Sequence, residues 1–298
     1  MCGIVGLFLK SESLKPELGR LTHLMLQEMR DRGPDSAGFA VYDEAGEASK
    51  LTCLSKSGET NWDELVLDLN AATGIDHDFK VLDDHALMMT IGDGVASRQW
   101  LIENAPDVTV LALGQSIELF KGVGDPINVA KRFGLEGRSG THAIAHTRMA
   151  TESAVTTAGS HPFSTGADTC LVHNGSLSNH NRLREKLRKQ GESFQTENDS
   201  EVAAGYFAWR MREGDSLETA VHHALEDLDG FFTFAIGTRD GFAVVRDPIA
   251  CKPAVIAETD DWVAMSSEFR AIAQLPGVEH AEIWEPAPAK VYSWSKAA

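Results

Sequence analysis

Cysteine is scarce and scattered in this sequence, which excludes two common kinds of site. The four cysteines lie far apart and form no CxxC pair: Cys2, Cys53, Cys170 and Cys251. Such spacing provides neither the ligand set of a zinc site nor the framework of a disulfide-stabilised domain. We therefore expect no metal in this chain and a reducing, cytoplasmic environment.

Long hydrophobic runs and basic residues are also lacking. The longest apolar runs, 3–9 and 108–113, are well below the roughly 18 residues that a membrane helix needs. The first residues include no basic segment of the kind that opens a secretion signal. With 27 Lys and Arg against 44 Asp and Glu, the formal charge is −17, which disfavours nucleic acids as partners. We expect a protein that binds neither membranes nor nucleic acids.

The composition and its patterning indicate a globular α+β protein. Hydrophobic residues make up 43% of the 298 positions and charged residues 24%, which allows a packed core. Short apolar runs bounded by Gly, Pro and Asp predict strands at 3–9, 39–42, 142–149, 168–173, 230–237, 242–246, 253–256 and 262–266. Helical periodicity predicts helices at 16–30, 178–190, 199–212 and 216–228. Strands at both ends with helices between them are typical of the α+β class.

The segment from about 45 to 138 has weaker periodicity and several acidic clusters. We interpret it as an insertion of unknown role, and we suspect that it packs against a partner. The chain is then a single domain that spans residues 1–298, although its length alone would also allow two domains.

Cys2 is the first candidate catalytic residue. Because the cysteine side chain is small, we expect removal of Met1, which leaves a residue that carries both a thiol and a free α-amine. A thiol with a pKa of about 8.5 needs a base, and an α-amine with a pKa of about 7.7 to 8.0 can take its proton. The alternative is that cysteine occupies the second position by chance, and position alone favours this alternative.

Three further polar groups lie where predicted strands end or helices begin. Arg148 ends a strand, and its guanidinium could bind the α-carboxylate of a small amino acid in a forked geometry. Asn174 and Gly175 offer an amide and an accessible backbone N–H, which together could form an oxyanion hole. Asp199 opens a helix and could bind a substrate ammonium. Each group also has a structural alternative, namely a surface ion pair, an Asn-Gly turn and a helix cap.

Five motifs in this order closely resemble those of the class II glutamine amidotransferases. They are MCGIVG at 1–6, RGPDSAG at 32–38, HTRMAT at 146–151, HNGSL at 173–177 and NDSE at 198–201, with RDPIACKPAV at 246–255 and SSE at 266–268 downstream. Within the family, the length, the TESAVTTAGSHPF loop and the RDPIACKPAV stretch look most like the amidotransferase-type component of N-methylglutamate synthase. That component is a relative of the glutaminase domain of glutamate synthase.

The resemblance implies an N-terminal nucleophile hydrolase fold, in which two antiparallel sheets pack face to face between helical layers as a four-layer αββα sandwich. It also implies catalytic roles. Cys2 is expected to attack the side-chain amide of glutamine, which releases ammonia and forms a γ-glutamyl thioester that water resolves to glutamate. Asn174 and the N–H of Gly175 are expected to stabilise the oxyanion.

The resemblance implies binding roles as well. Arg148 is expected to bind the α-carboxylate of glutamine and Asp199 its α-ammonium. Arg32 and Thr151 are expected to line the pocket. The loop 148–161 is expected to act as a lid that closes over glutamine and excludes water.

A partner is expected because an amidotransferase normally delivers its ammonia to a synthase site. The sequence contains no glycine-rich phosphate loop, flavin fingerprint or cysteine cluster, so we expect the ammonia acceptor on another polypeptide and no cofactor in this chain. By resemblance, the partner is a glutamate-synthase-like subunit of a hetero-oligomer, and any flavin and iron–sulfur centres are expected there. Two alternatives stay open: a stand-alone N-terminal cysteine amidase for another γ-glutamyl or ω-amide compound, and a non-catalytic assembly subunit.

Overall fold

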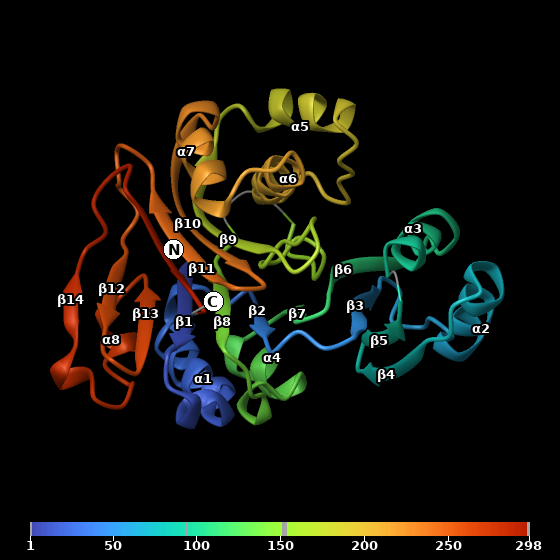
Figure 1. The fold of residues 1–298 in the computed structure, drawn as a ribbon, viewed down its shortest axis with the longest axis horizontal. Helices are drawn as coiled ribbons and strands as arrows, with labels where there is room; N and C mark the ends of the chain where they lie inside the picture. The colour runs from blue at the N-terminus through green and yellow to red at the C-terminus, as the bar shows by residue number, and fades with distance from the viewer. Residues whose placement is uncertain (1, 93, 151–153, 297–298) are drawn as a thin grey trace.

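Two antiparallel sheets form the centre of the protein, which confirms the predicted α+β class (Figure 1). The computed structural model describes residues 2–92, 94–150 and 154–296. Within these residues, the larger sheet has the spatial order β14 (Glu282–Trp284), β12 (Val255–Glu258), β13 (Trp262–Ser266), β1 (Gly3–Leu9), β8 (His142–Arg148), β2 (Ser36–Tyr42) and β7 (Ile117–Val123). The smaller sheet has the order β15 (Val291–Ser295), β11 (Gly241–Arg246), β10 (Gly230–Thr238) and β9 (Cys170–Leu177).

Helices cover the outer face of each sheet. The larger sheet contacts α1 (Leu18–Glu28), α4 (Pro126–Arg132) and α8 (Phe269–Ile272). The smaller sheet lies against α6 (Asp199–Arg212) and α7 (Leu217–Asp227), with α5 (His180–Lys189) packed on α6 (Figure 1). None of the helices in the described residues is long and apolar enough to cross a membrane. The layers therefore follow the order helix, sheet, sheet, helix, as the resemblance implies.

The alternation of side chains along β1 shows how these layers are held together. Ile4 and Phe8 belong to the apolar cluster between the two sheets, whereas Val5, Leu7 and Leu9 belong to the cluster between the larger sheet and its helices. Every residue of β1 is buried, because the strand has β8 and β13 on its two sides and a packed layer on each face. The strand is therefore a rigid support for the residue that precedes it.

Part of the predicted insertion forms a third sheet. Its strands follow the order β4 (Asp78–Leu82), β5 (His85–Ile91), β3 (Ala48–Ser55) and β6 (Val108–Gly114), and α2 (Trp62–Thr73) and α3 (Gly94–Asn104) complete the unit. Its apolar cluster includes residues of both helices and of three strands. The remaining part of the predicted insertion belongs to the main body, because β7 pairs with β2 and α4 packs on β2. The assignment of the whole chain to one domain stays a prediction.

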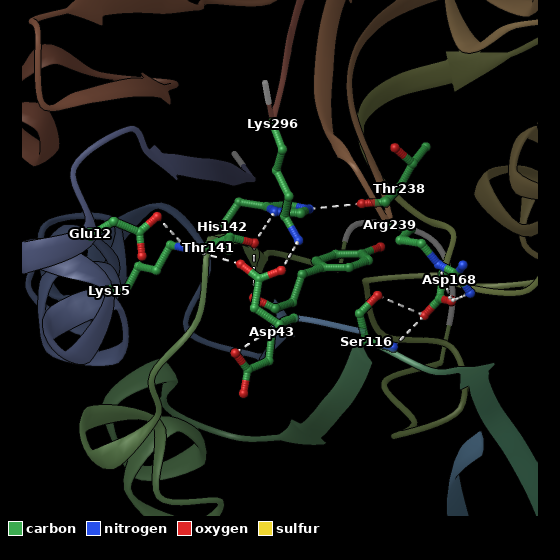
Figure 2. A network of polar contacts seen from close by, with 12 residues as sticks. Glu12, Lys15, Asp43, Ser116, Thr141, His142, Asp168, Thr238, Arg239 and Lys296 are labelled. Atoms are coloured by element: carbon green, nitrogen blue, oxygen red, sulfur yellow. Dashed lines mark hydrogen bonds and ion pairs between the residues drawn. The ribbon is translucent and has the colours of Figure 1, made fainter. Parts of the chain in front are cut away.

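A buried carboxylate fixes the turn between the third sheet and the larger sheet (Figure 2). Asp168, 4% exposed, accepts hydrogen bonds from the N–H groups of Ser116 at 2.8 Å and Ile117 at 3.0 Å, and from Arg239 at 3.1 Å. A Cβ at Gly114 would lie 2.0 Å from Asp168 Oδ1, so only glycine fits there. Burial alone would raise the pKa of Asp168, but the hydrogen bonds outweigh it and lower the pKa. The ionised carboxylate thus holds the turn that joins β6 to β7.

Replacing Asp168 by asparagine is expected to destabilise the fold by about 3 kcal/mol, because the amide presents a donor where N–H groups need an acceptor. Urea unfolding at pH 7 measures the loss, with Asp260→Asn at an exposed position as the control. The pKa of Asp168 is lowered on folding. Its contribution is therefore complete above the pKa of unfolded aspartate, about 3.9, and is lost as the pH falls through the lower folded value. Equal stability of the two proteins at pH 7 would contradict this role.

Candidate active site

Cys2 lies immediately before β1, at the end of the central strand. The backbone N–H of Ile4 donates to Ser267 Oγ at 2.9 Å, and the N–H of Ser267 donates to the carbonyl of Ile4 at 3.1 Å. Gly3 allows close contact with β8, since a Cβ there would lie 2.8 Å from Thr147 Oγ1. The Cys2 side chain is partly exposed. The hydrogen-bonded main chain after Cys2 therefore holds this thiol at the end of β1, where it is partly accessible to solvent.

Two predicted site residues hold the main chain of Cys2. Arg32, which lies in the short 3-10 helix Arg30–Arg32, donates from Nε to the carbonyl of Cys2 at 2.9 Å, and Asn174 Nδ2 donates to the same carbonyl at 3.4 Å. Arg32 is 9% exposed and also forms an ion pair with Glu268 at 2.5 Å. In this structure Arg32 thus positions Cys2, in addition to any role at the pocket wall. Thr151 lies outside the described residues.

Arg148 is the last residue of β8, and it is 7% exposed, so it is not the surface arginine of the structural alternative. The sulfur of Cys2 lies 3.9 Å from the carbonyl oxygen of the next residue, Met149. A Cβ at Gly33 would lie 2.4 Å from the backbone nitrogen of Arg148, so glycine lets the RGPDSAG segment pack directly on this strand end. Asp35 completes the contact, because its N–H donates to the Arg148 carbonyl at 3.1 Å. The main chain of Arg148 is therefore fixed, and the residue that follows it lies next to the thiol.

Asn174 and Gly175 lie within β9, and not in a turn. β9 continues to Leu177, beyond the predicted end at residue 173, and Gly175 pairs with Phe232 of β10. Gly175 has a φ of +152°, and a Cβ at this position would lie 2.0 Å from the carbonyl oxygen of Phe231. Both facts require glycine. The strand thereby brings the Asn174 amide to Cys2.

Asp199 is the first residue of α6, and its neighbour Asn198 is the helix cap, with Oδ1 accepting from the N–H of Ser200 at 2.9 Å. The Asp199 carboxylate instead accepts from the N–H of Leu177 at 2.9 Å, at the end of β9. Its side chain is 23% exposed, so an oxygen stays accessible to a ligand. The capping alternative therefore applies to Asn198, and Asp199 is available for a substrate ammonium.

Three buried histidines lie behind these residues. His146 and His161 have ring centroids 4.2 Å apart, and His146 Nε2 contacts the carbonyl of His173 at 3.1 Å. Burial lowers the pKa of His146 to about 3 and that of His173 to about 4, so both are neutral at pH 7. Among the described residues, no histidine forms a hydrogen bond with Cys2.

The structure brings Arg32, Asn174 and the end of β8 to Cys2, and it places Asp199 at the end of β9. It also adds three residues to which the sequence alone assigned no role. Ser267 and Glu268 anchor β1 and Arg32, and Asp35 anchors the end of β8. These residues belong to the SSE and RGPDSAG motifs, which were the only signal for them. A thiol, an amide donor, a buried guanidinium and a carboxylate at one edge of the sandwich can bind an amino acid and attack its side-chain carbonyl.

Sequence comparison finds relatives across the whole chain. Residues 146–274 match the family model described as glutamine amidotransferase domain. Over 296 residues, the chain is 54% identical to the glutamine amidotransferase-like protein GlxB of Rhizobium meliloti (strain 1021), and the match covers 99% of this chain and 98% of that protein. The family model begins at His146, so the similarity that includes Cys2 comes from the full-length relative.

Comparison with solved structures shows the fold. The glutamine phosphoribosylpyrophosphate amidotransferase of B. subtilis, solved with ADP and GMP, superposes with a TM-score of 0.60 at 21% identity and covers 99% of this chain. A second structure, of the allosteric regulatory enzyme of purine biosynthesis, gives a TM-score of 0.64 at 22% identity. This chain spans 49% and 47% of those two chains.

Proposed function

Because this chain belongs to the class II glutamine amidotransferases, we propose that it hydrolyses the side-chain amide of glutamine at Cys2 and supplies the ammonia to a synthase subunit. The observation that carries the proposal is the position of Cys2. It precedes a central strand, its carbonyl accepts from Asn174 at 3.4 Å, and its sulfur lies 3.9 Å from the residue after Arg148.

The proposed reaction begins when loss of Met1 frees the α-amine of Cys2. The amine takes the thiol proton, and the sulfur attacks the amide carbon of glutamine to form a tetrahedral oxyanion. Asn174 and the N–H of Gly175 stabilise this charge, and each such donor is worth about 3 kcal/mol in other enzymes. The C–N bond then breaks, the ammonium returns its proton to the leaving nitrogen, and ammonia departs. Water hydrolyses the thioester to glutamate and restores the thiol.

Recognition of glutamine depends on its two charged α-groups. Arg148 binds the α-carboxylate and Asp199 binds the α-ammonium, while Arg32 and Thr151 line the pocket. The burial of Arg148 supports this assignment, because a forked contact between a guanidinium and a carboxylate is stronger away from water. The loop 148–161 is proposed to close over the bound substrate.

The ammonia acceptor is proposed to lie on another polypeptide. The resemblance favours a glutamate-synthase-like partner, namely the remaining subunits of N-methylglutamate synthase, with flavin and iron–sulfur centres on those subunits and none here. Cys2, Cys53, Cys170 and Cys251 are all free thiols, which supports a reducing, cytoplasmic location.

The purified chain, alone and with co-purified partners, tests the proposal. We expect release of ammonia and glutamate from glutamine, an intact mass that lacks Met1, and γ-glutamyl hydroxamate when hydroxylamine traps the thioester. Faster cleavage of another ω-amide would favour the stand-alone amidase. No cleavage of glutamine even with the partner present would favour the assembly subunit.

A further inference from the structure

A buried lysine holds the segment 158–162, which lies between β8 and β9 in the sequence. Lys121 of β7 is 3% exposed, and its Nζ donates to the carbonyls of Ala158 at 2.9 Å, Ser160 at 2.8 Å and Pro162 at 3.2 Å. The ammonium also lies 4.4 Å from the ring centroid of Phe163. Lysine is almost never buried without partners, and here three carbonyls match its three N–H donors.

The RGPDSAG motif makes room for this contact. Gly38 of β2 pairs with Lys121 in the larger sheet. A Cβ at Gly38 would lie 2.3 Å from the carbonyl oxygen of His161 and 2.5 Å from the Cβ of Lys121. Glycine at this position therefore lets the segment 158–162 cross β2 and reach the lysine.

The segment 158–162 lies between the two groups proposed to bind the charges of glutamine. A Cβ at Gly159 would lie 4.0 Å from Nη1 of Arg148. The carbonyl of Gly159 accepts from Asn198 Nδ2 at 3.3 Å, and Asn198 directly precedes Asp199. One short stretch of main chain thus lies close to the arginine side chain and is hydrogen-bonded to the cap of α6, so its position affects the distance between them.

A buried carboxylate accompanies the lysine on the side of α6. Glu201 is 5% exposed, and it lines the same small cavity as Lys121 between β6, β7 and α6. Its oxygens accept from the N–H groups of Gln195 at 2.8 Å and Thr196 at 2.7 Å. Burial lowers the pKa of Lys121 to about 7, and Glu201 opposes this shift while Arg148 adds to it. The lysine therefore interacts by charge with the proposed carboxylate-binding arginine and with the helix that carries Asp199.

We infer that Lys121 is a positioning residue for substrate recognition: by holding three carbonyls of the segment 158–162, it sets the spacing between Arg148 and Asp199. The inference rests on the proposed function. Lys121 touches neither Cys2 nor the reacting atoms, so its loss should weaken binding of the α-groups much more than it slows chemistry at the thiol.

Replacing Lys121 by methionine tests this, because methionine keeps most of the volume and removes the donors. Iodoacetamide alkylates Cys2, and peptide mass spectrometry separates that product from alkylated Cys251. L-Glutamate, which carries both α-groups, should protect Cys2. We expect the half-protecting glutamate concentration to rise about tenfold or more in Lys121→Met, because small misplacements of binding groups are costly. The alkylation rate without glutamate should be unchanged, and KM for glutamine should rise more than kcat falls.

Two further variants separate the outcomes. Lys50→Met removes a lysine of the third sheet that forms an ion pair with Glu118 at 3.0 Å, and it should leave protection unchanged. Lys121→Gln retains amide donors and should give an intermediate value. Normal protection of Lys121→Met overturns the inference while the proposed function stands, and so does failure of both Lys121 variants to fold. Absence of protection in the wild-type protein contradicts the proposed function and this inference with it.

Discussion

Replacing Cys2 by alanine is expected to abolish glutamine hydrolysis, with a loss of about 10⁵-fold in kcat, because removal of a covalent nucleophile leaves only binding and oxyanion stabilisation. No other thiol can take its place. Cys53 and Cys170 are fully buried, and burial raises the pKa of each to about 12. Cys251 is exposed but lies on the loop after β11. Release of glutamate measured by a coupled assay, with γ-glutamyl hydroxamate as a second readout, quantifies the loss.

The fold should survive this substitution. The Cys2 side chain makes one weak contact, 3.9 Å to a carbonyl, whereas Arg32 and Asn174 bind the Cys2 main chain, which alanine retains. Thermal unfolding should therefore be unchanged. Cys251→Ala is the matched control and should keep full activity. A rate of hydrolysis by Cys2→Ala within tenfold of wild type would exclude Cys2 as the nucleophile. Loss of activity in Cys251→Ala would indicate that Cys251 takes part in the reaction, which contradicts the assignment.

The sequence predicted the central elements well for a physical reason. Strands buried on both faces appear as short continuous apolar runs, and GIVGLFL at 3–9 matches β1 residue for residue. The helix 199–212 also matches α6, because an Asn cap and acidic residues in the first turn mark its start. The first element directly follows Cys2 and the second begins with Asp199, so much of the site's framework could be predicted.

The elements without a strong pattern were not predicted. The short strands β14 and β15 contain no fully buried residue, so no apolar run distinguishes them from loops. The third sheet was likewise missed, because its edge strand β4 is largely exposed and its helices have weak amphipathic patterns. The end of β9 was misplaced, since Asn174-Gly175 is a common turn sequence and only the pairing with β10 makes it a strand.

The contacts that position the site depend on residues far apart in the chain. The ion pair of Arg32 with Glu268 and the hydrogen bond of Ile4 with Ser267 join the two ends of the sequence. The three hydrogen bonds from Lys121 to carbonyl groups join β7 to the segment 158–162. The hydrophobic periodicity of a single sequence reports only local structure. Contacts between distant segments therefore become visible only in the folded protein.

Arg148 is the second site residue whose loss should have a large effect. Arg148→Ala is expected to raise KM for glutamine by about 100-fold or more, because the substrate α-carboxylate loses a forked, charge-assisted contact beside a buried site. The fall in kcat should be smaller, since Cys2 and Asn174 stay in place. Initial rates over a wide range of glutamine concentrations measure both constants. The same variant should discriminate little between glutamine and an analogue that lacks the α-carboxylate, whereas wild type should prefer glutamine strongly.

Two variants make this test specific to the guanidinium fork. Arg148→Lys keeps the charge and loses the second parallel hydrogen bond, so its KM should lie between those of wild type and Arg148→Ala. Arg30→Ala removes a nearby arginine that is 58% exposed and paired with Asp125 at 2.5 Å, and its KM should be normal. A normal KM in Arg148→Ala would exclude the carboxylate role. Equal KM values in the lysine and alanine variants would show that fork geometry, more than charge, determines binding.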